Sequence, residues 1–114
     1  MLKNNIYELI GNTPLVRITS PQGGATLWGK LESANPGGSV KDRIAKAKIE
    51  QAEKDGRLKP GSVIVEPTSG NTGIGISQVG SIKGYQVVLT MPDTMSVERR
   101  RLLGDFGAEL IITP

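Results

Sequence analysis

The sequence contains no cysteine and no histidine. The first absence excludes disulfide bonds and metal sites built on thiolates. The second excludes serine–histidine triads, histidine acid–base catalysis and the commonest protein metal ligand, so we expect no metal site. Any chemistry at neutral pH must therefore come from lysine, carboxylates, hydroxyl groups or a bound cofactor.

The chain also has few aromatic residues, little net charge and no long apolar run. Its 114 residues include one Trp, one Phe and two Tyr, and the formal net charge is +3. That charge is too small to indicate nucleic-acid binding and only mildly favours anionic ligands. No segment is apolar over the length of a membrane span, and no signal-peptide core begins the sequence. We expect a soluble, cytoplasmic protein that binds neither nucleic acid nor membranes.

Apolar runs and turn residues predict an alternation of strands and helices. Short strands are expected at residues 15–18 and 25–31, buried strands at 62–66, 85–90 and 110–112, and helices at 40–54, 71–83 and 96–106. This order indicates an α/β fold with an open, mostly parallel sheet that carries helices on both faces. We expect residues 1–114 to form a single α/β unit. Because nothing follows to cover the edge of the last strand, the unit looks like a fragment of a longer protein.

Lys41 lies in the first turn of the helix predicted at residues 40–54, directly after a Pro-Gly-Gly turn. Ser39 is expected to cap that helix. A helical wheel places Lys41 between two apolar stripes and assigns Asp42 to a charged face. The stripes consist of Val40, Ile44 and Ala47, and of Ala45, Ile49 and Ala52. An amine beside apolar side chains at the positive end of a helix is a candidate nucleophile or Schiff-base lysine. The alternative is a lysine whose ammonium group extends to water, as expected for Lys48.

A loop rich in hydroxyl groups, residues 68–73 (TSGNTG), joins a predicted buried strand to a helix. Ligands bind at the carboxyl ends of strands in open α/β sheets, and amides at helix N-termini bind anions. The loop therefore suits a carboxylate or a phosphate, although a purely structural N-cap is the alternative. It lacks the lysine of a Walker loop and the glycine spacing of the dinucleotide fingerprint. The arginine run at residues 99–101 is interpreted as a solvated helix face.

Four motifs follow one another along the chain: GNTPL at residues 11–15, NPGGSVKDR at 35–43, EPTSGNTG at 66–73 and TMPDTMSVERR at 90–100. In this order and spacing they resemble the cysteine synthase (O-acetylserine sulfhydrylase) family. The resemblance implies the type II fold of pyridoxal-phosphate enzymes, the cofactor pyridoxal 5′-phosphate and a homodimer. It further implies β-replacement on O-acetylserine with sulfide to give cysteine, an amino-acid substrate, and serine acetyltransferase as a candidate partner.

By this resemblance Lys41 is the catalytic lysine, which binds the cofactor covalently and later removes the substrate Cα proton. The substrate α-carboxylate would be held by Thr68, Ser69, Gly70, Asn71 and Thr72. Asn71 would also contact the cofactor. The implied chemistry agrees with the residues present, because a cofactor that serves as an electron sink makes histidine unnecessary.

Two features depart from the family pattern. The chain stops after the first third of the family's length, so the glycine-rich loop for the cofactor phosphate and the serine at the pyridine nitrogen are absent. Gln78, Gly80 and Ser81 stand where relatives usually carry small apolar residues. Without the rest of the enzyme we expect this face to meet water, where polar residues would help solubility, and ordinary sequence variation is the alternative. Little or no activity is expected of this chain alone, and a non-catalytic α/β fragment or scaffold is the alternative. Cystathionine β-synthase and threonine dehydratase are related alternatives, and sulfide, thiosulfate and homocysteine stay open as the sulfur donor.

Overall fold

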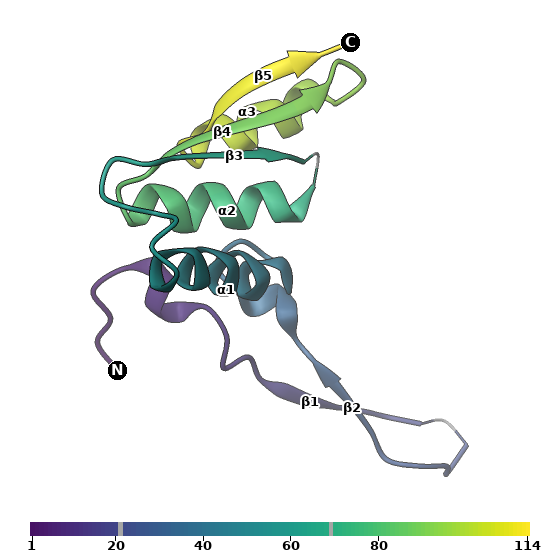
Figure 1. The fold of residues 1–114 in the computed structure, drawn as a ribbon. Helices are drawn as coiled ribbons and strands as arrows, with labels where there is room; N and C mark the ends of the chain where they lie inside the picture. Colours follow the sequence, from purple (N-terminus) through teal and green to yellow (C-terminus); the bar gives the residue numbers. More distant parts are fainter. Residues whose placement is uncertain (21, 69) are drawn as a thin grey trace.

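The computed structural model describes residues 1–20, 22–68 and 70–114 (Figure 1). A 3₁₀ helix, η1 (Ile6–Leu9), precedes a hairpin of β1 (Leu15–Ile18) and β2 (Leu27–Lys30) and a second 3₁₀ helix, η2 (Glu32–Ala34). The chain then alternates between α1 (Lys41–Lys54), β3 (Val63–Pro67), α2 (Asn71–Ile82), β4 (Gln86–Pro92), α3 (Val97–Asp105) and β5 (Glu109–Thr113). The predicted strands and helices are confirmed, with ends that differ by one or two residues, whereas neither 3₁₀ helix was predicted. Within the described ranges no helix is long and apolar enough to cross a membrane.

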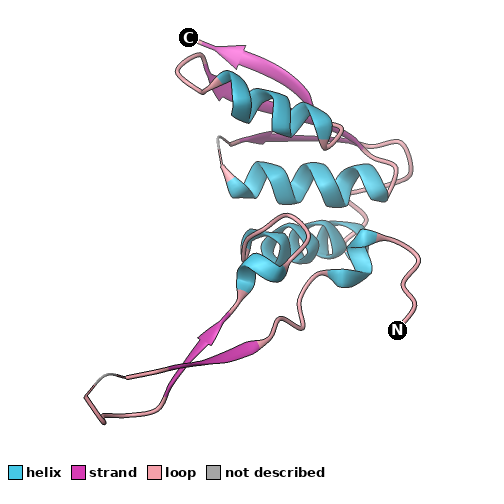
Figure 2. Cartoon of the chain, turned by 180° about the vertical axis from the view of Figure 1, so that it is seen from behind, coloured by secondary structure: helices cyan, strands magenta, loops and turns pink. Residues whose placement is uncertain are grey.

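Strands β3, β4 and β5 form a parallel sheet with β4 in the centre. Helices α2 and α3 lie against the same face of this sheet, and they stand in front of the strands when the molecule is seen from behind (Figure 2). The prediction of an α/β fold with a parallel sheet is confirmed. Helices were predicted on both faces of the sheet, whereas among the described residues helices α2 and α3 cover one face.

The opposite face of the sheet carries apolar side chains that reach solvent. Val63 is 50% exposed, Val65 60% and Ile111 47%. Alternation along the strands and the pairing of Val65 with Val88 place these side chains on the face away from the helices. The prediction that β3 and β5 are buried on both faces is therefore wrong for the described chain, although Val88 and its neighbours in β4 are buried.

The core lies between α2, α3 and the covered face of the sheet. Val79 of α2, Leu89 of β4 and Leu103 of α3 are each 0% exposed. Gln78 and Gly80 are also buried, so the expectation that they face water is wrong. Among the three positions that depart from the family pattern, Ser81 is exposed, and its hydroxyl donates to the Phe106 carbonyl at 3.1 Å.

Helices α1 and α2 pack side by side with their N-termini at the same end (Figure 1). At this end a Cβ added to Gly75 would lie 3.0 Å from Ala45 Cβ, so the glycine permits the close approach. At the other end the Glu53 carboxylate accepts from Lys83 Nζ at 2.9 Å and from the Tyr85 hydroxyl at 2.7 Å. The two helices are therefore parallel and are fixed at both ends.

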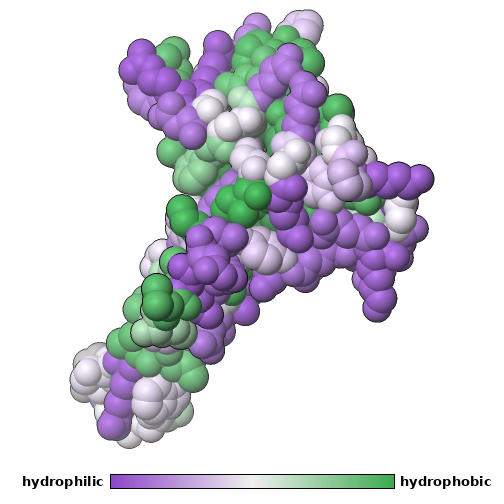
Figure 3. Space-filling view, turned by 90° about the vertical axis from the view of Figure 1, so that its left-hand side faces the viewer, coloured by the Kyte–Doolittle hydropathy of each residue, from purple (hydrophilic) through white to green (hydrophobic). Residues whose placement is uncertain are grey.

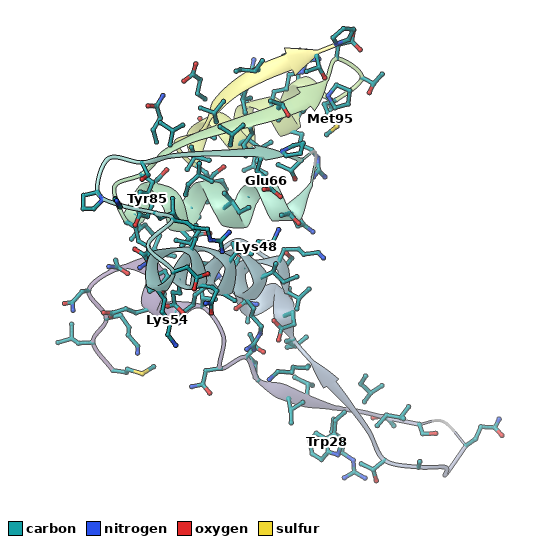
Figure 4. All side chains as sticks on the ribbon, viewed as in Figure 1. Trp28, Lys48, Lys54, Glu66, Tyr85 and Met95 are labelled. Carbon is teal, nitrogen blue, oxygen red and sulfur yellow. The ribbon has the colours of Figure 1, made fainter. Side chains whose placement is uncertain are left out.

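Helix α1 is also linked to the edge of the sheet. Lys48, expected to extend to water, forms an ion pair with Glu66 of β3, with Nζ and Oε1 3.6 Å apart. Figure 4 shows the two side chains between α1 and β3.

The hairpin of β1 and β2 projects away from the body formed by the helices and the sheet (Figure 1). Its antiparallel strands pair Val16 with Gly29 and Arg17 with Trp28. Apolar residues gather on this arm in the space-filling view (Figure 3), and Trp28 is 59% exposed. The arm accounts for a radius of gyration of 16.7 Å, compared with about 13 Å for a compact chain of this length.

Candidate functional site

A polar network holds the start of α1 in place. The Arg43 guanidinium donates to both carboxylate oxygens of Glu32, at 2.9 and 3.0 Å, and to Thr13 Oγ1 at 3.1 Å. Asn35 Nδ2 donates to the same carboxylate at 2.7 Å and to the Ser39 carbonyl at 3.0 Å. These hydrogen bonds, with Arg43 the largest contributor, lower the pKa of Glu32 to about 2. The network therefore joins the turn before β1, η2 and the first turn of α1.

Asp42 is fully buried beside the Pro-Gly-Gly turn. Its Oδ2 accepts from the Gly37 amide at 2.6 Å, whereas Oδ1 has no hydrogen-bond partner among the described residues. A Cβ on Gly37 would overlap this carboxylate. Burial raises the pKa of Asp42, and the hydrogen bond from Gly37 partly offsets that effect. The prediction of an exposed Asp42 is wrong, because a helical wheel does not include the turn that folds over that side of the helix.

Lys41 begins α1 and is partly exposed. The predicted cap, Ser39, lies one residue before the N-cap position, Val40, but its hydroxyl accepts from the Lys41 amide at 3.1 Å. Val40 and Ile44 are exposed, so the stripe predicted on that side does not enclose the lysine. No described residue forms an ion pair or hydrogen bond with the Lys41 side chain. The amine is thus held at the helix start without a protein partner.

The described residues of the loop, Thr68 and residues 70–73, join the end of β3 to the first turn of α2, as predicted. Thr68 Oγ1 accepts from the amide of Gly73 at 3.1 Å and from that of Gly70 at 3.4 Å. The threonine hydroxyl therefore caps α2 from outside the helix, while its own O–H group is left to donate. Ser69, one of the predicted site residues, lies outside the described residues.

Asn71 and Thr72 form the first turn of α2. Asn71 is exposed and Thr72 half-buried, and their amides donate to no other described residue. Arg99 of α3 also lies at this end, because its Nη1 is 3.9 Å from the place of a Cβ on Gly70. Two amides that donate to no described residue make this turn suitable for an anion, and the Arg99 guanidinium adds positive charge nearby. Sequence reasoning missed Arg99, since nothing in the local pattern shows that α3 returns to the loop.

The structure brings Lys41 and the loop to one end of the α1–α2 pair. The Lys41 carbonyl lies 3.1 Å from the place of a Cβ on Gly75, one turn into the helix that Asn71 begins. The amine and the first turn of α2 therefore belong to adjacent helix N-termini at the carboxyl end of β3. This arrangement can hold a molecule that carries both a carbonyl group for the amine and an acidic group for the turn.

The chain is similar to known proteins over nearly its whole length. The family model described as pyridoxal-phosphate dependent enzyme matches residues 6–114. The chain is 58% identical to a cysteine synthase of Staphylococcus aureus (strain Mu50 / ATCC 700699) over 97% of its own length and 36% of that protein. Among solved structures, it is similar to a hydrogen sulfide-producing enzyme from Fusobacterium nucleatum, with a TM-score of 0.93 and 49% identity, over 99% of this chain and 38% of that one.

An O-ureido-L-serine synthase structure is similar as well, with a TM-score of 0.91 and 46% identity, over 100% of this chain and 36% of that one. The chain thus spans little more than a third of the length of the relatives it matches. Within that span the family match covers nearly every residue, including Lys41 and the loop after β3. The chain therefore belongs to the family of pyridoxal-phosphate dependent enzymes.

Proposed function

We propose that this chain carries the lysine-bearing part of a cysteine synthase, which replaces the acetate of O-acetylserine with sulfide and releases cysteine. The observation that supports this proposal is the Lys41 amine at the start of α1, which pairs with no described residue. It lies beside the helix whose first-turn amides donate to no described residue. The 58% identity to a cysteine synthase supports the same reaction.

The residues present fit pyridoxal 5′-phosphate in their chemistry. The aldehyde of the cofactor requires a primary amine that no carboxylate already pairs, and Lys41 meets this requirement among the described residues. Asn71 is exposed at the adjacent helix start, where its carboxamide can contact a bound molecule. When bound, the cofactor supplies an electron sink for charge that develops at the substrate α-carbon.

In this proposal the residues of the chain bind the substrate and move its proton. Lys41 Nζ would hold the cofactor before the substrate binds. Once the bound substrate has released it as a free amine, Lys41 Nζ would take the proton from the substrate α-carbon. The substrate α-carboxylate is held by Thr68, Ser69, Gly70, Asn71 and Thr72. The amides of the first turn of α2 face that anion, and the helix N-terminus favours its negative charge.

The 114 residues form one α/β unit of an enzyme of the relatives' length in this proposal. Neither the loop for the cofactor phosphate nor the serine at the pyridine nitrogen is among them, so little or no activity is expected from this chain by itself. We place the complete enzyme in the cytoplasm as a homodimer, with serine acetyltransferase as a candidate partner. The name of the similar O-ureido-L-serine synthase favours chemistry on a serine derivative, and the attacking nucleophile stays open.

Cofactor capture tests the proposal. The chain is mixed with pyridoxal phosphate and reduced with borohydride, and the modified lysine is located by mass spectrometry. We expect one dominant adduct at Lys41, which is lost in Lys41→Ala and kept in the matched variant Lys48→Ala. Labelling spread over many lysines and unchanged in Lys41→Ala would contradict the proposal and favour a non-catalytic scaffold. Circular dichroism of both variants verifies that they fold.

A further inference from the structure

Asp42 is the one buried residue in the first turn of α1, residues 41–44. It is 0% exposed, whereas Lys41 and Arg43 are partly exposed and Ile44 is exposed. Burial removes the hydration of a carboxylate, which is unfavourable unless the protein uses the group. The proposed binding of cofactor and substrate gives this carboxylate no part, so its burial indicates a different role.

Both the Pro-Gly-Gly turn and α2 contact Asp42. Its Oδ2 accepts from the Gly37 amide at 2.6 Å, and a Cβ on Gly37 would overlap the carboxylate. The Asp42 Cα lies 3.4 Å and the Lys41 carbonyl oxygen 3.1 Å from the place of a Cβ on Gly75 of α2. The first turn of α1 is thus fixed to the Pro-Gly-Gly turn by the Asp42 carboxylate and packed against α2 by its backbone.

The position of the Lys41 amine depends on this turn, because no described residue holds its side chain by a hydrogen bond or an ion pair. The direction in which a side chain leaves a helix is set by the helix backbone. A small rotation of the first turn of α1 would therefore change the distance between the amine and the first turn of α2, which begins with Asn71.

We propose that Asp42 is a positioning residue, whose hydrogen bond with Gly37 aligns the Lys41 amine with the first turn of α2 so that one molecule reaches both. The inference rests on the proposed function, since it takes the amine and that turn as two parts of one site. The role requires an acceptor at residue 42 and no charge, because the Gly37 amide is neutral. Misplacement of a reacting group by about 1 Å can lower a rate by about 100-fold.

The test uses glyoxylate, an aldehyde that carries a carboxylate, and acetaldehyde, which has the same number of carbon atoms and no charge. With cyanoborohydride present, a lysine amine attacks the aldehyde carbon, water leaves, and hydride reduces the resulting imine to a stable secondary amine. Mass spectrometry of the 114-residue chain gives the modification of Lys41 relative to Lys59, an exposed lysine before β3.

The Lys41/Lys59 ratio with glyoxylate, divided by the same ratio with acetaldehyde, measures the alignment. This quotient, the carboxylate preference, cancels differences in basicity between the two amines. We expect a carboxylate preference of at least about fivefold in the natural chain, because the first turn of α2 attracts the carboxylate of glyoxylate.

Variants test whether residue 42 maintains the alignment. Asp42→Ala should lower the carboxylate preference to about one, and Asp42→Asn, which keeps an acceptor for Gly37, should restore it to within about twofold of the natural value. Gly37→Ala should lower it with Asp42 present, because the added Cβ displaces the carboxylate. Asp105→Ala, at an exposed position of α3, should leave it unchanged. Circular dichroism verifies that each variant is folded under the labelling conditions.

A carboxylate preference near one in the natural chain would overturn the positioning role. So would a preference that Asp42→Ala and Gly37→Ala leave unchanged, or one that Asp42→Asn fails to restore. Capture of pyridoxal phosphate is scored separately. Capture at Lys41 without any effect of residue 42 on the preference overturns this inference alone, whereas a preference that depends on Asp42 without such capture overturns the proposed function alone. If Asp42→Ala does not fold, Asp42→Asn and Gly37→Ala decide the matter.

Discussion

Glu32 shows how one residue can control the candidate site without touching a ligand. Its carboxylate accepts from Arg43, Thr13 and Asn35, which come from three separate segments. Arg43 lies two residues after Lys41, so the ion pair fixes the turn of α1 from which the amine extends. Bidentate pairs of this kind combine charge with a defined geometry.

The acid sensitivity of the fold should depend on Glu32. Its pKa is lowered from 4.5 in the unfolded chain to about 2, so the ionised carboxylate stabilises the fold at pH values above about 4.5. That stabilisation is lost as the pH falls from about 4.5 toward about 2. We therefore expect the melting temperature to fall over this range in the natural chain and to fall less in Glu32→Gln.

Circular-dichroism melts at a series of pH values measure this difference. Glu98→Gln, on the exposed side of α3, serves as the control and should retain the full acid-induced decrease. Asp42 acts in the opposite direction, since its raised pKa favours protonation of the folded state in acid. Identical pH profiles for the natural chain and Glu32→Gln would contradict the role assigned to the network.

For single residues, the sequence indicates which side chains are candidates for catalysis or binding, but it does not indicate which other residues fix their positions. Lys41 and the loop after β3 were placed correctly at two helix starts, because turn residues and caps are local signals. Glu32, Asp42 and Arg99 were missed or misplaced. Their positions depend on chain segments that meet only in the folded molecule, and a helical wheel cannot show such contacts.

Gly75 determines how closely two elements pack. A Cβ at this position would lie 3.0 Å from Ala45 Cβ and 3.1 Å from the Lys41 carbonyl. Both distances are shorter than an ordinary contact, and one involves backbone that cannot rotate away. A side chain at residue 75 would therefore separate α1 from α2 at the end that carries the candidate site.

Two alanine substitutions in helices should have opposite effects. Gly75→Ala should lower the free energy of unfolding by about 1–3 kcal/mol, because it overpacks the contact between α1 and α2. Gly104→Ala, in α3, has nothing within 4 Å of the added Cβ and should raise that free energy by about 0.5–1 kcal/mol. Urea unfolding measures both values, and a stabilising Gly75→Ala would show that the helices are less tightly packed than described.

The order and type of the helices and strands could be predicted because the apolar pattern and the turn residues between elements are clear from residue 40 onward. Burial could not be predicted equally well. A run such as Val63-Ile64-Val65 is typical of a strand covered on both faces, yet the described residues cover one. Whether a face is covered depends on what packs there, and a strand sequence carries no information about whether that partner is present.

The molecule as a whole consists of a body and an arm. The arm holds β1 and β2, whose strand residues are all at least partly exposed, and it extends the molecule to 53 Å in its longest dimension. A two-stranded hairpin is marginally stable without packing support. The described contacts of the arm are chiefly between its own strands, so its order depends on these and on their junction with η2.

Trp28 reports on the state of the arm, because it is the only tryptophan in the sequence. It is 59% exposed and points away from the body (Figure 4). We expect its fluorescence emission to resemble that of tryptophan in water, to be readily quenched by acrylamide and to change little when the chain is unfolded in urea. Emission at shorter wavelength in the native chain, lost on unfolding, would mean that another surface covers the arm in solution.

The parallel packing of α1 and α2 would couple the binding of an anion at their N-termini to the stability of the whole chain. Two helices with their N-termini together place two partial positive charges side by side, and this repulsion acts against the close contact at Gly75. A bound anion at that end would reduce the repulsion for both helices at once. Its binding free energy would then appear as resistance to unfolding that rises with the logarithm of its concentration. A ligand bound at that end would in this way complete the packing of the two helices.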